Sequence, residues 1–152
     1  MFINQTEKME KGNNWLGVSE RAVRTSDCPV WIKDEMTGLC YALPYGEHVI
    51  GRKDDVENDI PVRTEDVFMS RRHAVLTVTQ NLLEETEVYI QMLEEAANPV
   101  FVRLPPVAGG HPSEFQPLGS DLSFLLFDGS WFILGKSLFS LHYRLAKDSV
   151  FS

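Results

Sequence analysis

Gly46-Glu47-His48-Val49-Ile50-Gly51-Arg52 is followed, after 17 intervening residues, by Ser70-Arg71-Arg72-His73-Ala74, and these two segments decide the fold. The first is a short apolar run that ends in a glycine–arginine pair, which is typical of a β-strand entering a loop. The second places a serine three residues before a histidine and opens a run in which apolar and polar side chains alternate from Ala74 to Thr79. Such alternation indicates a half-buried strand. The polar segment 53–69 between them predicts loops around one very short strand at 60–62.

Short apolar runs divided by turn residues continue on both sides of these segments. They lie at 30–32, 39–43, 122–127, 131–134 and, with strict alternation, at 139–145. The first two flank Lys33–Gly38, which predicts a hairpin with Thr37-Gly38 in its turn. Several short strands at this spacing predict an all-β fold, an antiparallel two-sheet β-sandwich.

The stretch 81–97 fits two kinds of structure. Its five glutamates and several leucines allow a helix by propensity. Apolar residues alternate with Tyr89 and Gln91, however, which favours a strand from Glu87 onward. A helical turn elsewhere in the stretch stays open at this point. Further on, a segment rich in proline and glycine predicts a long loop insertion near 104–120.

The composition is that of one globular domain. Of the 152 residues, 43% are hydrophobic and 24% are charged, and a chain of this size buries roughly two-thirds of its unfolded surface. No apolar stretch approaches the roughly 20 residues that span a bilayer, and the polar residues 1–14 offer no core for a secretory signal. We therefore expect an intracellular protein with no membrane partner. We expect 1–28 to be a flexible polar leader, 29–147 to form the domain, and 148–152 to be a tail.

Several kinds of chemistry are excluded by the residues present. The net charge of −8 argues against broad nucleic-acid binding, which needs a basic face, but it is compatible with a small basic pocket for one anion. Cys28 and Cys40 form no CxxC pair, and the four histidines lack metal-ligand spacing. Leu134–Ser137 looks like the end of a nucleotide-binding loop, but Ser130 stands where that motif needs glycine. We expect no metal, no cofactor, no catalytic residues and no enzyme activity.

The spacing of the two deciding segments resembles the forkhead-associated (FHA) domain, whose signature is a Gly-Arg pair followed by Ser-x-x-His. Gly51-Arg52 and Ser70 to His73 carry this resemblance. It extends more weakly to Asn98, in the place of an asparagine-containing turn, and to Gly129–Gly135, which is similar to a later Gly-Asp…Leu-Gly element. In all it covers 30–146. The resemblance implies a β-sandwich of about eleven strands that binds phosphothreonine-containing segments of other proteins.

The resemblance also implies a phosphate site. A phosphothreonine carries about −1.5 to −2 charges and three acceptor oxygens, which suit the donor fork of an arginine and the hydroxyl of a serine. Each residue alone has an ordinary alternative as a surface charge, a turn residue or a structural histidine. The roles implied are phosphate binding for Arg52, Ser70 and Arg71, peptide binding for Asn98, and structural support for Gly51 and His73.

This chain departs from the FHA pattern in the asparagine turn. The family usually has Ser/Thr-Asn-Gly, whereas this chain has Ala97-Asn98-Pro99. Ala97 lacks a hydroxyl group, and Pro99 fixes φ near −65° where glycine permits positive values. These differences favour an alternative, in which a divergent FHA scaffold binds an unphosphorylated protein partner.

Within the family, 30–32, 51–53 and 70–77 are similar to the start of nibrin-type DNA-break repair proteins. That resemblance implies a nuclear scaffold. We expect a monomeric module within a longer signalling protein, located in the nucleus or cytoplasm with the nucleus favoured.

Overall fold

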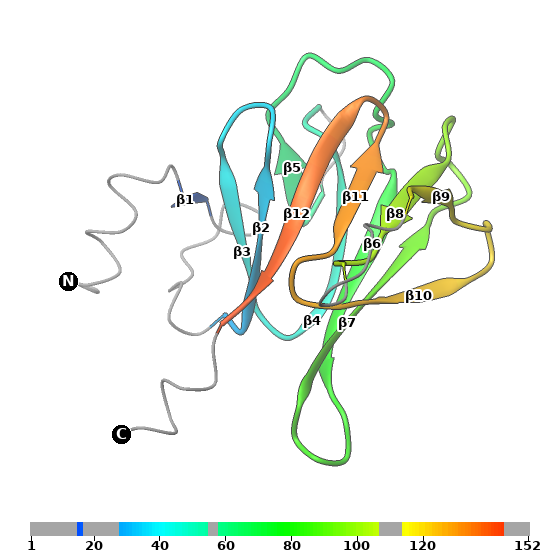
Figure 1. Ribbon diagram of the computed structural model, residues 1–152. Helices are drawn as coiled ribbons and strands as arrows, with labels where there is room; N and C mark the ends of the chain where they lie inside the picture. Colours follow the sequence, from blue (N-terminus) through cyan, green and yellow to red (C-terminus); the bar gives the residue numbers. More distant parts are fainter. Residues whose placement is uncertain (1–14, 17–27, 55–57, 107–113, 145–152) are drawn as a thin grey trace.

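The computed structural model describes residues 15–16, 28–54, 58–106 and 114–144. The described residues form strands and loops only (Figure 1), and none of them belongs to a helix long and apolar enough to cross a membrane. The strands are β1 Trp15–Leu16, β2 Val30–Asp34, β3 Cys40–Leu43, β4 Gly46–Arg52, β5 Ile60–Val62, β6 Ala74–Gln80, β7 Thr86–Met92, β8 Val100–Arg103, β9 Gln116–Pro117, β10 Ser123–Leu126, β11 Trp131–Leu134 and β12 Ser137–Tyr143.

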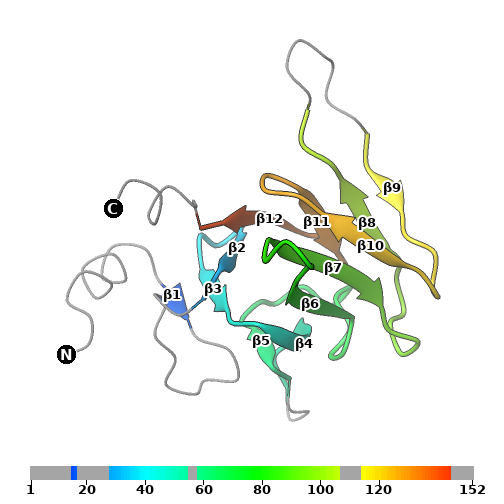
Figure 2. The ribbon, with the colours of Figure 1, turned by 90° about the horizontal axis from the view of Figure 1, so that it is seen from below.

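The strands form two sheets that pack face to face (Figure 2). The larger has the order β1-β3-β2-β12-β11-β8-β9, and the smaller has the order β10-β7-β6-β4-β5. The predicted all-β sandwich is confirmed. All interior pairs are antiparallel, and two edge pairs, β1 with β3 and β4 with β5, add parallel ladders to it.

The core lies between the sheets and follows the alternation of the sequence. In β6, Ala74, Leu76 and Val78 are fully buried or nearly so. In β11 and β12, the rings of Phe132 and Phe139 stack with their centroids 5.2 Å apart. Burying a large apolar side chain contributes roughly 1.5–3 kcal/mol, and this drives the two inner faces together. The strand predicted from Glu87 onward is confirmed as β7, so packing against the neighbouring strands prevails over the helical propensity of its glutamates.

The first hairpin forms as predicted. Val30 of β2 pairs with Leu43 of β3, and the turn between them contains Gly38 with φ of 81°. Asp34 begins the turn, since its Oδ1 accepts the backbone N–H groups of Met36 and Thr37. An aspartate that accepts these bonds stabilises a tight turn.

Two short strands lie where the sequence predicts none. β9 occurs inside the predicted loop near 104–120 and pairs with β8, so the described part of that segment is tied to the larger sheet. β1 lies within the predicted leader and pairs with Cys40 and Tyr41. Cys28, the last residue of the predicted leader, is buried. Residues 1–14 and 17–27 of the leader, and the predicted tail, fall outside the described residues.

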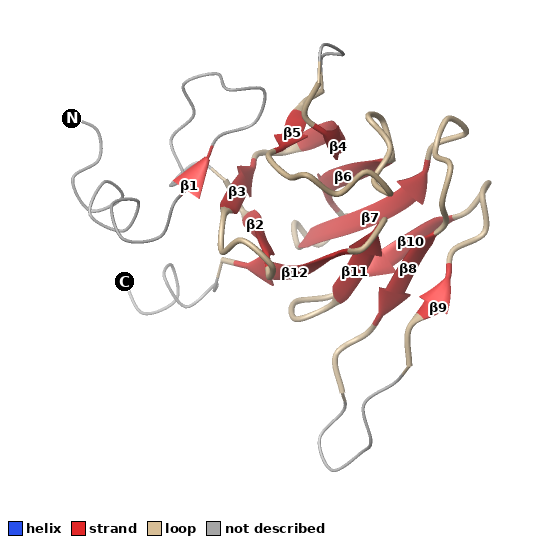
Figure 3. Cartoon of the chain, turned by 90° about the horizontal axis from the view of Figure 1, so that it is seen from above, coloured by secondary structure: helices blue, strands red, loops and turns tan. Residues whose placement is uncertain are grey.

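The strand registers bring three loops together at one end of the sandwich. Ile50, near the end of β4, lies opposite Ala74 at the start of β6, which in turn lies opposite Met92 at the end of β7. The segments that follow β4, precede β6 and follow β7 therefore meet at a single rim (Figure 3). Loops on one end of a rigid sandwich are a common place for binding residues.

Candidate functional site

Arg52 is fixed at the end of β4 by the loop that precedes β6. Its backbone N–H donates to the Ser70 carbonyl oxygen at 3.0 Å, and its side-chain Nε donates to the Met69 carbonyl oxygen at 3.1 Å. The side chain is 28% exposed. An arginine anchored through Nε keeps its two Nη groups for other acceptors.

Ser70 is held by two hydrogen bonds that leave its hydroxyl proton available. Its Oγ accepts the Ala97 N–H at 2.9 Å, and its own N–H donates to Nδ1 of His73 at 2.9 Å. A serine hydroxyl that accepts one bond can still donate its hydrogen. Ser70 therefore offers a donor at the rim, in a position set by both flanking loops.

His73 links the loop before β6 to the loop after β7. Because Nδ1 accepts the Ser70 N–H, the ring proton must lie on Nε2, which donates to the Asn98 carbonyl oxygen at 2.9 Å. The ring is completely buried. Burial lowers the pKa of His73, and the opposing effects of the Asn98 carbonyl and of Asp66 are smaller. The imidazole is thus neutral and structural near pH 7.

Gly51 is needed because two chain segments approach closely. A Cβ atom at Gly51 would lie 2.1 Å from the Arg71 carbonyl oxygen and 2.8 Å from that of Ser70. The Arg71 carbonyl also accepts a hydrogen bond from Nδ2 of the buried Asn58. Any side chain at position 51 would therefore displace the backbone that carries Ser70 and Arg71.

Arg71 and Arg52 meet at one carboxylate. Nη1 of Arg71 lies 3.7 Å from Asp54 Oδ2, and Nη1 of Arg52 lies 3.9 Å from the same oxygen. Arg71 is the more exposed of the two, at 55%. Arg72 points elsewhere, because its Nε forms a 3.1 Å ion pair with Glu95. Two guanidinium groups around one acidic oxygen form a small site for an anion.

Asn98 lies in this rim but already uses its side-chain amide. Nδ2 donates to the Phe68 carbonyl oxygen at 2.9 Å, which ties the loop after β7 to the loop before β6. Outside glycine, Glu84 alone among the described residues has a positive φ, so Ala97, Asn98 and Pro99 all keep ordinary backbone conformations. The turn therefore differs from one built around glycine, as Pro99 requires.

Asp66 connects this rim to the turn between β11 and β12. Its Oδ2 accepts the Lys136 N–H at 2.8 Å and the Ser137 hydroxyl at 2.7 Å, and its Oδ1 accepts the Phe68 N–H at 2.9 Å. Burial raises the pKa of the Asp66 carboxyl, but these hydrogen bonds together outweigh burial and leave the pKa lowered. Gly135, with φ of 65°, makes room for the same loop.

The structure places all six predicted residues in one region, and it adds three that the sequence did not single out. The added residues are Asp54, Asn58 and Asp66. Asp54 follows Arg52 by two positions, which was the only available signal for it. The bonds of Asn58 and Asp66 depend on the paths of loops that sequence spacing does not define. Within the described ranges, no group of histidine, cysteine and acidic residues is arranged to hold a metal.

Comparisons with known proteins agree with the fold. The FHA domain family matches residues 48–114. No curated protein sequence matches the chain. Among solved structures, the FHA domain of the CT664 protein from Chlamydia trachomatis is similar at 20% identity and a TM-score of 0.52, covering 76% of this chain and 98% of that one.

Two further similar structures contain peptides. One is the MEK1 FHA domain in complex with a phosphothreonine peptide of HOP1, at 12% identity and a TM-score of 0.55, covering 78% of this chain and 99% of that one. The other is Mycobacterium tuberculosis EmbR in complex with a low-affinity phosphopeptide, at 21% identity and a TM-score of 0.54, covering 78% of this chain and 25% of that one. With the family match, the shared sandwich and the Gly-Arg and Ser-x-x-His motifs at its rim, the chain contains a forkhead-associated (FHA) domain.

Proposed function

We propose that this FHA domain binds protein segments that carry phosphothreonine, with Arg52, Ser70 and Arg71 as the phosphate contacts. The observation that carries the proposal is the convergence of these residues, since Arg52 ends strand β4 and Ser70 and Arg71 lie in the loop before β6. The Arg52 backbone bonds Ser70, and the side chains of Arg52 and Arg71 share Asp54. The similar MEK1 and EmbR structures are complexes with phosphopeptides, which supports phosphopeptide binding as the function of this fold here.

The donors at this rim match the charge and geometry of a phosphate. Each guanidinium provides charge-assisted hydrogen bonds, which are roughly twice as strong as neutral ones. The Ser70 hydroxyl adds a third donor, which the Ala97 N–H orients by occupying the serine oxygen. A phosphate dianion offers three acceptor oxygens, so all three side chains find a partner.

The peptide backbone would be read by Asn98. Its Nδ2 is held by the Phe68 carbonyl, which leaves the carbonyl end of the side chain to accept an N–H from an extended peptide. Asn98 therefore has an orientation imposed by the protein before any peptide binds. We assign it the role of fixing the peptide beside the phosphate.

The proposal is tested by titrating the protein with a degenerate library of phosphothreonine peptides and with the matching unphosphorylated library. We expect binding only to the phosphorylated form, and we expect Arg52→Ala to weaken it by at least about tenfold because a charge-assisted bond is lost. Arg72→Ala is the matched control, since it removes the same charge one position from Arg71 but is paired with Glu95. Equal loss in both variants would mean that binding follows net charge alone and would contradict the proposal.

A divergent scaffold that binds an unphosphorylated partner is the second candidate. It is favoured by Ala97, which has no hydroxyl to offer phosphate, and by the internal use of the Asn98 amide. The same pair of libraries separates the two functions. Equal affinity for the phosphorylated and unphosphorylated forms would establish the scaffold and remove phosphate recognition.

In its wider setting, we propose a non-enzymatic, monomeric module of an intracellular signalling protein. The rim supports a binding role over a catalytic one, because what it offers is hydrogen-bond donors for an anion. Assays of hydrolase and transferase activity on the bound phosphopeptide should show no turnover.

A further inference from the structure

The turn between β6 and β7 presents two leucines to solvent. It lies away from the rim that carries Arg52, Ser70 and Arg71, here called the phosphate rim. Leu82 is 101% exposed and Leu83 is 77% exposed. β6 begins at Ala74 beside the end of β4 and finishes at Gln80, so the turn lies at the opposite end of the smaller sheet. Figure 1 shows this green hairpin projecting beyond the other strands. Side chains this exposed contribute nothing to the core.

One asparagine stabilises the backbone of the turn through several hydrogen bonds. Asn81 Oδ1 accepts the N–H groups of Leu83 at 2.8 Å and of Glu85 at 3.0 Å, and the Asn81 N–H donates to the Glu85 carbonyl at 2.9 Å. Nδ2 of Asn81 also bonds the carboxylates of Glu85 and Glu87. Glu84 adopts φ of 64°, a conformation that costs energy for a residue with a side chain. The backbone that carries the exposed leucines is therefore held in one conformation before any partner arrives.

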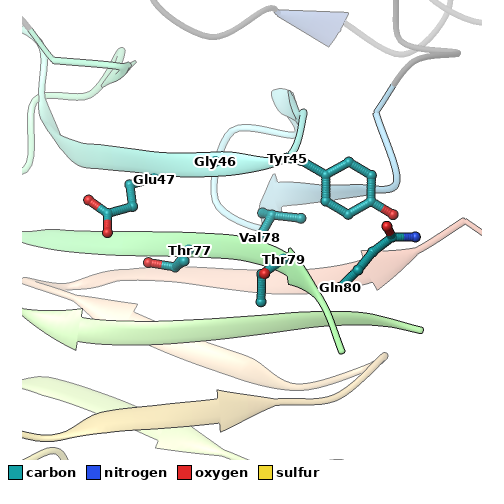
Figure 4. Close-up of a pocket in the computed structure, with 7 residues that line it drawn as sticks. All are labelled: Tyr45, Gly46, Glu47, Thr77, Val78, Thr79 and Gln80. Carbon is teal, nitrogen blue, oxygen red and sulfur yellow. The ribbon is translucent and has the colours of Figure 1, made fainter. Parts of the chain in front are cut away.

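A shallow groove adjoins the turn. It has a volume of about 440 Å³ and lies between the start of β4 and the end of β6, where Figure 4 shows Tyr45, Glu47 and Gln80 around it. The Tyr45 hydroxyl is 2.8 Å from Thr86 Oγ, and Gln80 Nε2 donates to the Glu84 carbonyl at 3.2 Å. The groove and the turn 81–85 thus form one continuous surface, here called the hairpin surface.

The hairpin surface is acidic. In the segments 45–49 and 77–89, every residue with a full charge at pH 7 is a glutamate, namely Glu47, Glu84, Glu85 and Glu87. Acidic groups around exposed apolar side chains complement a basic segment that carries apolar residues. They also oppose contact with an anionic lipid surface.

We propose that the hairpin surface docks a lysine- or arginine-flanked segment of a partner protein, with Leu82 and Leu83 contacting apolar side chains of that segment. The preformed turn lowers the entropic cost of docking, because its backbone need not be ordered on binding. The glutamates provide the preference for basic flanks. This contact is separate from phosphate recognition and leaves the rim free, so that one domain holds two segments at once.

The test uses ¹⁵N-labelled full chain and a matched set of synthetic peptides in which lysine or glutamate flanks surround either leucines or serines. We expect only the lysine–leucine peptide to shift the resonances of 45–47 and 77–87. The double variant Leu82→Ser/Leu83→Ser should lose at least about tenfold in affinity and keep the wild-type thermal unfolding midpoint, because both leucines are outside the core. Arg52→Ala should bind this peptide as the wild type does.

Three outcomes would overturn the proposal: no shifts with any peptide, equal shifts with the glutamate–leucine peptide, or shifts confined to the phosphate rim. A fourth outcome would also overturn it: binding of the protein to vesicles containing phosphatidylserine that is lost in the double variant, which would assign the leucines to a membrane. Failure of phosphothreonine binding would leave this result unaffected, since the two surfaces use different residues.

Discussion

At the scale of single residues, the phosphate rim contains an acidic group among its cations. Asp54 Oδ2 lies 3.9 Å from Arg52 Nη1 and 3.7 Å from Arg71 Nη1. In the free protein the carboxylate therefore occupies part of the space around both guanidinium groups. A phosphate that takes the same donors must displace it.

Asp54→Asn should consequently strengthen phosphopeptide binding. The carboxylate and the cations are partly exposed, so their attraction is worth at most about 1 kcal/mol, which corresponds to a gain of up to about fivefold. Isothermal titration calorimetry at low salt measures this gain. Glu65→Gln makes the same change in net charge at an exposed position in the loop before β6 and should leave affinity unchanged. Weaker binding by Asp54→Asn would show instead that the carboxylate positions the arginines.

Ser70 gives a second prediction at this scale. Ser70→Ala removes a donor to an ionised phosphate, a bond worth about 1.5–3 kcal/mol, so the dissociation constant should rise roughly 10- to 100-fold. Ser70→Thr keeps the hydroxyl and should retain most of the affinity. Binding of the alanine variant at the wild-type level, measured by fluorescence anisotropy, would remove Ser70 from the phosphate contacts.

At the scale of elements, the rim depends on the close approach of β4 to the loop before β6. Gly51→Ala would place a Cβ 2.1 Å from the Arg71 carbonyl oxygen and 2.5 Å from its carbon. These are backbone atoms, so the loop that carries Ser70 and Arg71 must move. We expect both a lower unfolding free energy, by about 1–3 kcal/mol as in overpacked sites, and a loss of phosphopeptide binding.

The control for this glycine is Gly119→Ala, whose Cβ would meet the Leu122 side chain at 3.2 Å. A side chain adjusts more easily than a backbone, so affinity should stay at the wild-type value. Denaturant unfolding and peptide titration of both variants provide the comparison. Wild-type binding by Gly51→Ala would contradict the role given to this approach.

Comparing the predicted strands with the observed ones shows which parts of the fold the sequence could predict. β6 and β7 were predicted because their alternating side chains mark one buried face. The β2–β3 hairpin and β5 were predicted because short apolar runs stand beside turn and polar residues. β1 and β9 have two residues each, too few to display any period. Their pairing is decided by the neighbouring strands, which the local sequence does not describe.

The candidate site, too, could be predicted from the sequence only in part. Five of the six predicted residues could be found because they belong to the Gly-Arg and Ser-x-x-His motifs, and Asn98 because it stands at the asparagine turn of the FHA pattern. The bond from the Ala97 N–H to Ser70 Oγ joins positions 27 residues apart, and the Asp66–Ser137 bond joins positions 71 apart. Such contacts follow from how the loops pack at the rim, so spacing alone could not predict them.

At the scale of the whole molecule, stability should depend on pH through two histidines, of which His73 is buried and His142 is half-buried. Burial lowers the pKa of His73 and of His142, whereas an unfolded histidine titrates near pH 6.5. The unfolded chain therefore binds more protons below about pH 6.5, and the folded state loses stability as pH falls from there. Urea unfolding at pH 7.5 and pH 5.5 should show a lower unfolding free energy at the acidic value.

His73→Gln isolates the contribution of the rim histidine, because glutamine does not titrate. Its pH dependence over this range should be weaker than that of the wild type. An unchanged slope in this variant would mean that His73 does not lose its hydrogen bond from Ser70 on protonation.

The whole domain is best described as a rigid sandwich with different chemistry at its two ends. Cationic donors gather at the end where β4 finishes, and exposed leucines among glutamates project from the end where β6 finishes. The core between them fixes their separation and orientation.

The most direct test of phosphate recognition is a pH titration of the bound phosphopeptide, in which ³¹P NMR monitors the ionisation of the phosphate. The second ionisation of free phosphothreonine lies near pH 6. Two arginines that hold the dianion must lower this pKa in the complex, and affinity must then fall as pH drops from about 7 toward 5. We predict a bound phosphate that stays doubly charged at pH values where the free peptide takes up a proton, and that loses this shift in Arg52→Ala. A bound phosphate that titrates as the free peptide does would contradict the account.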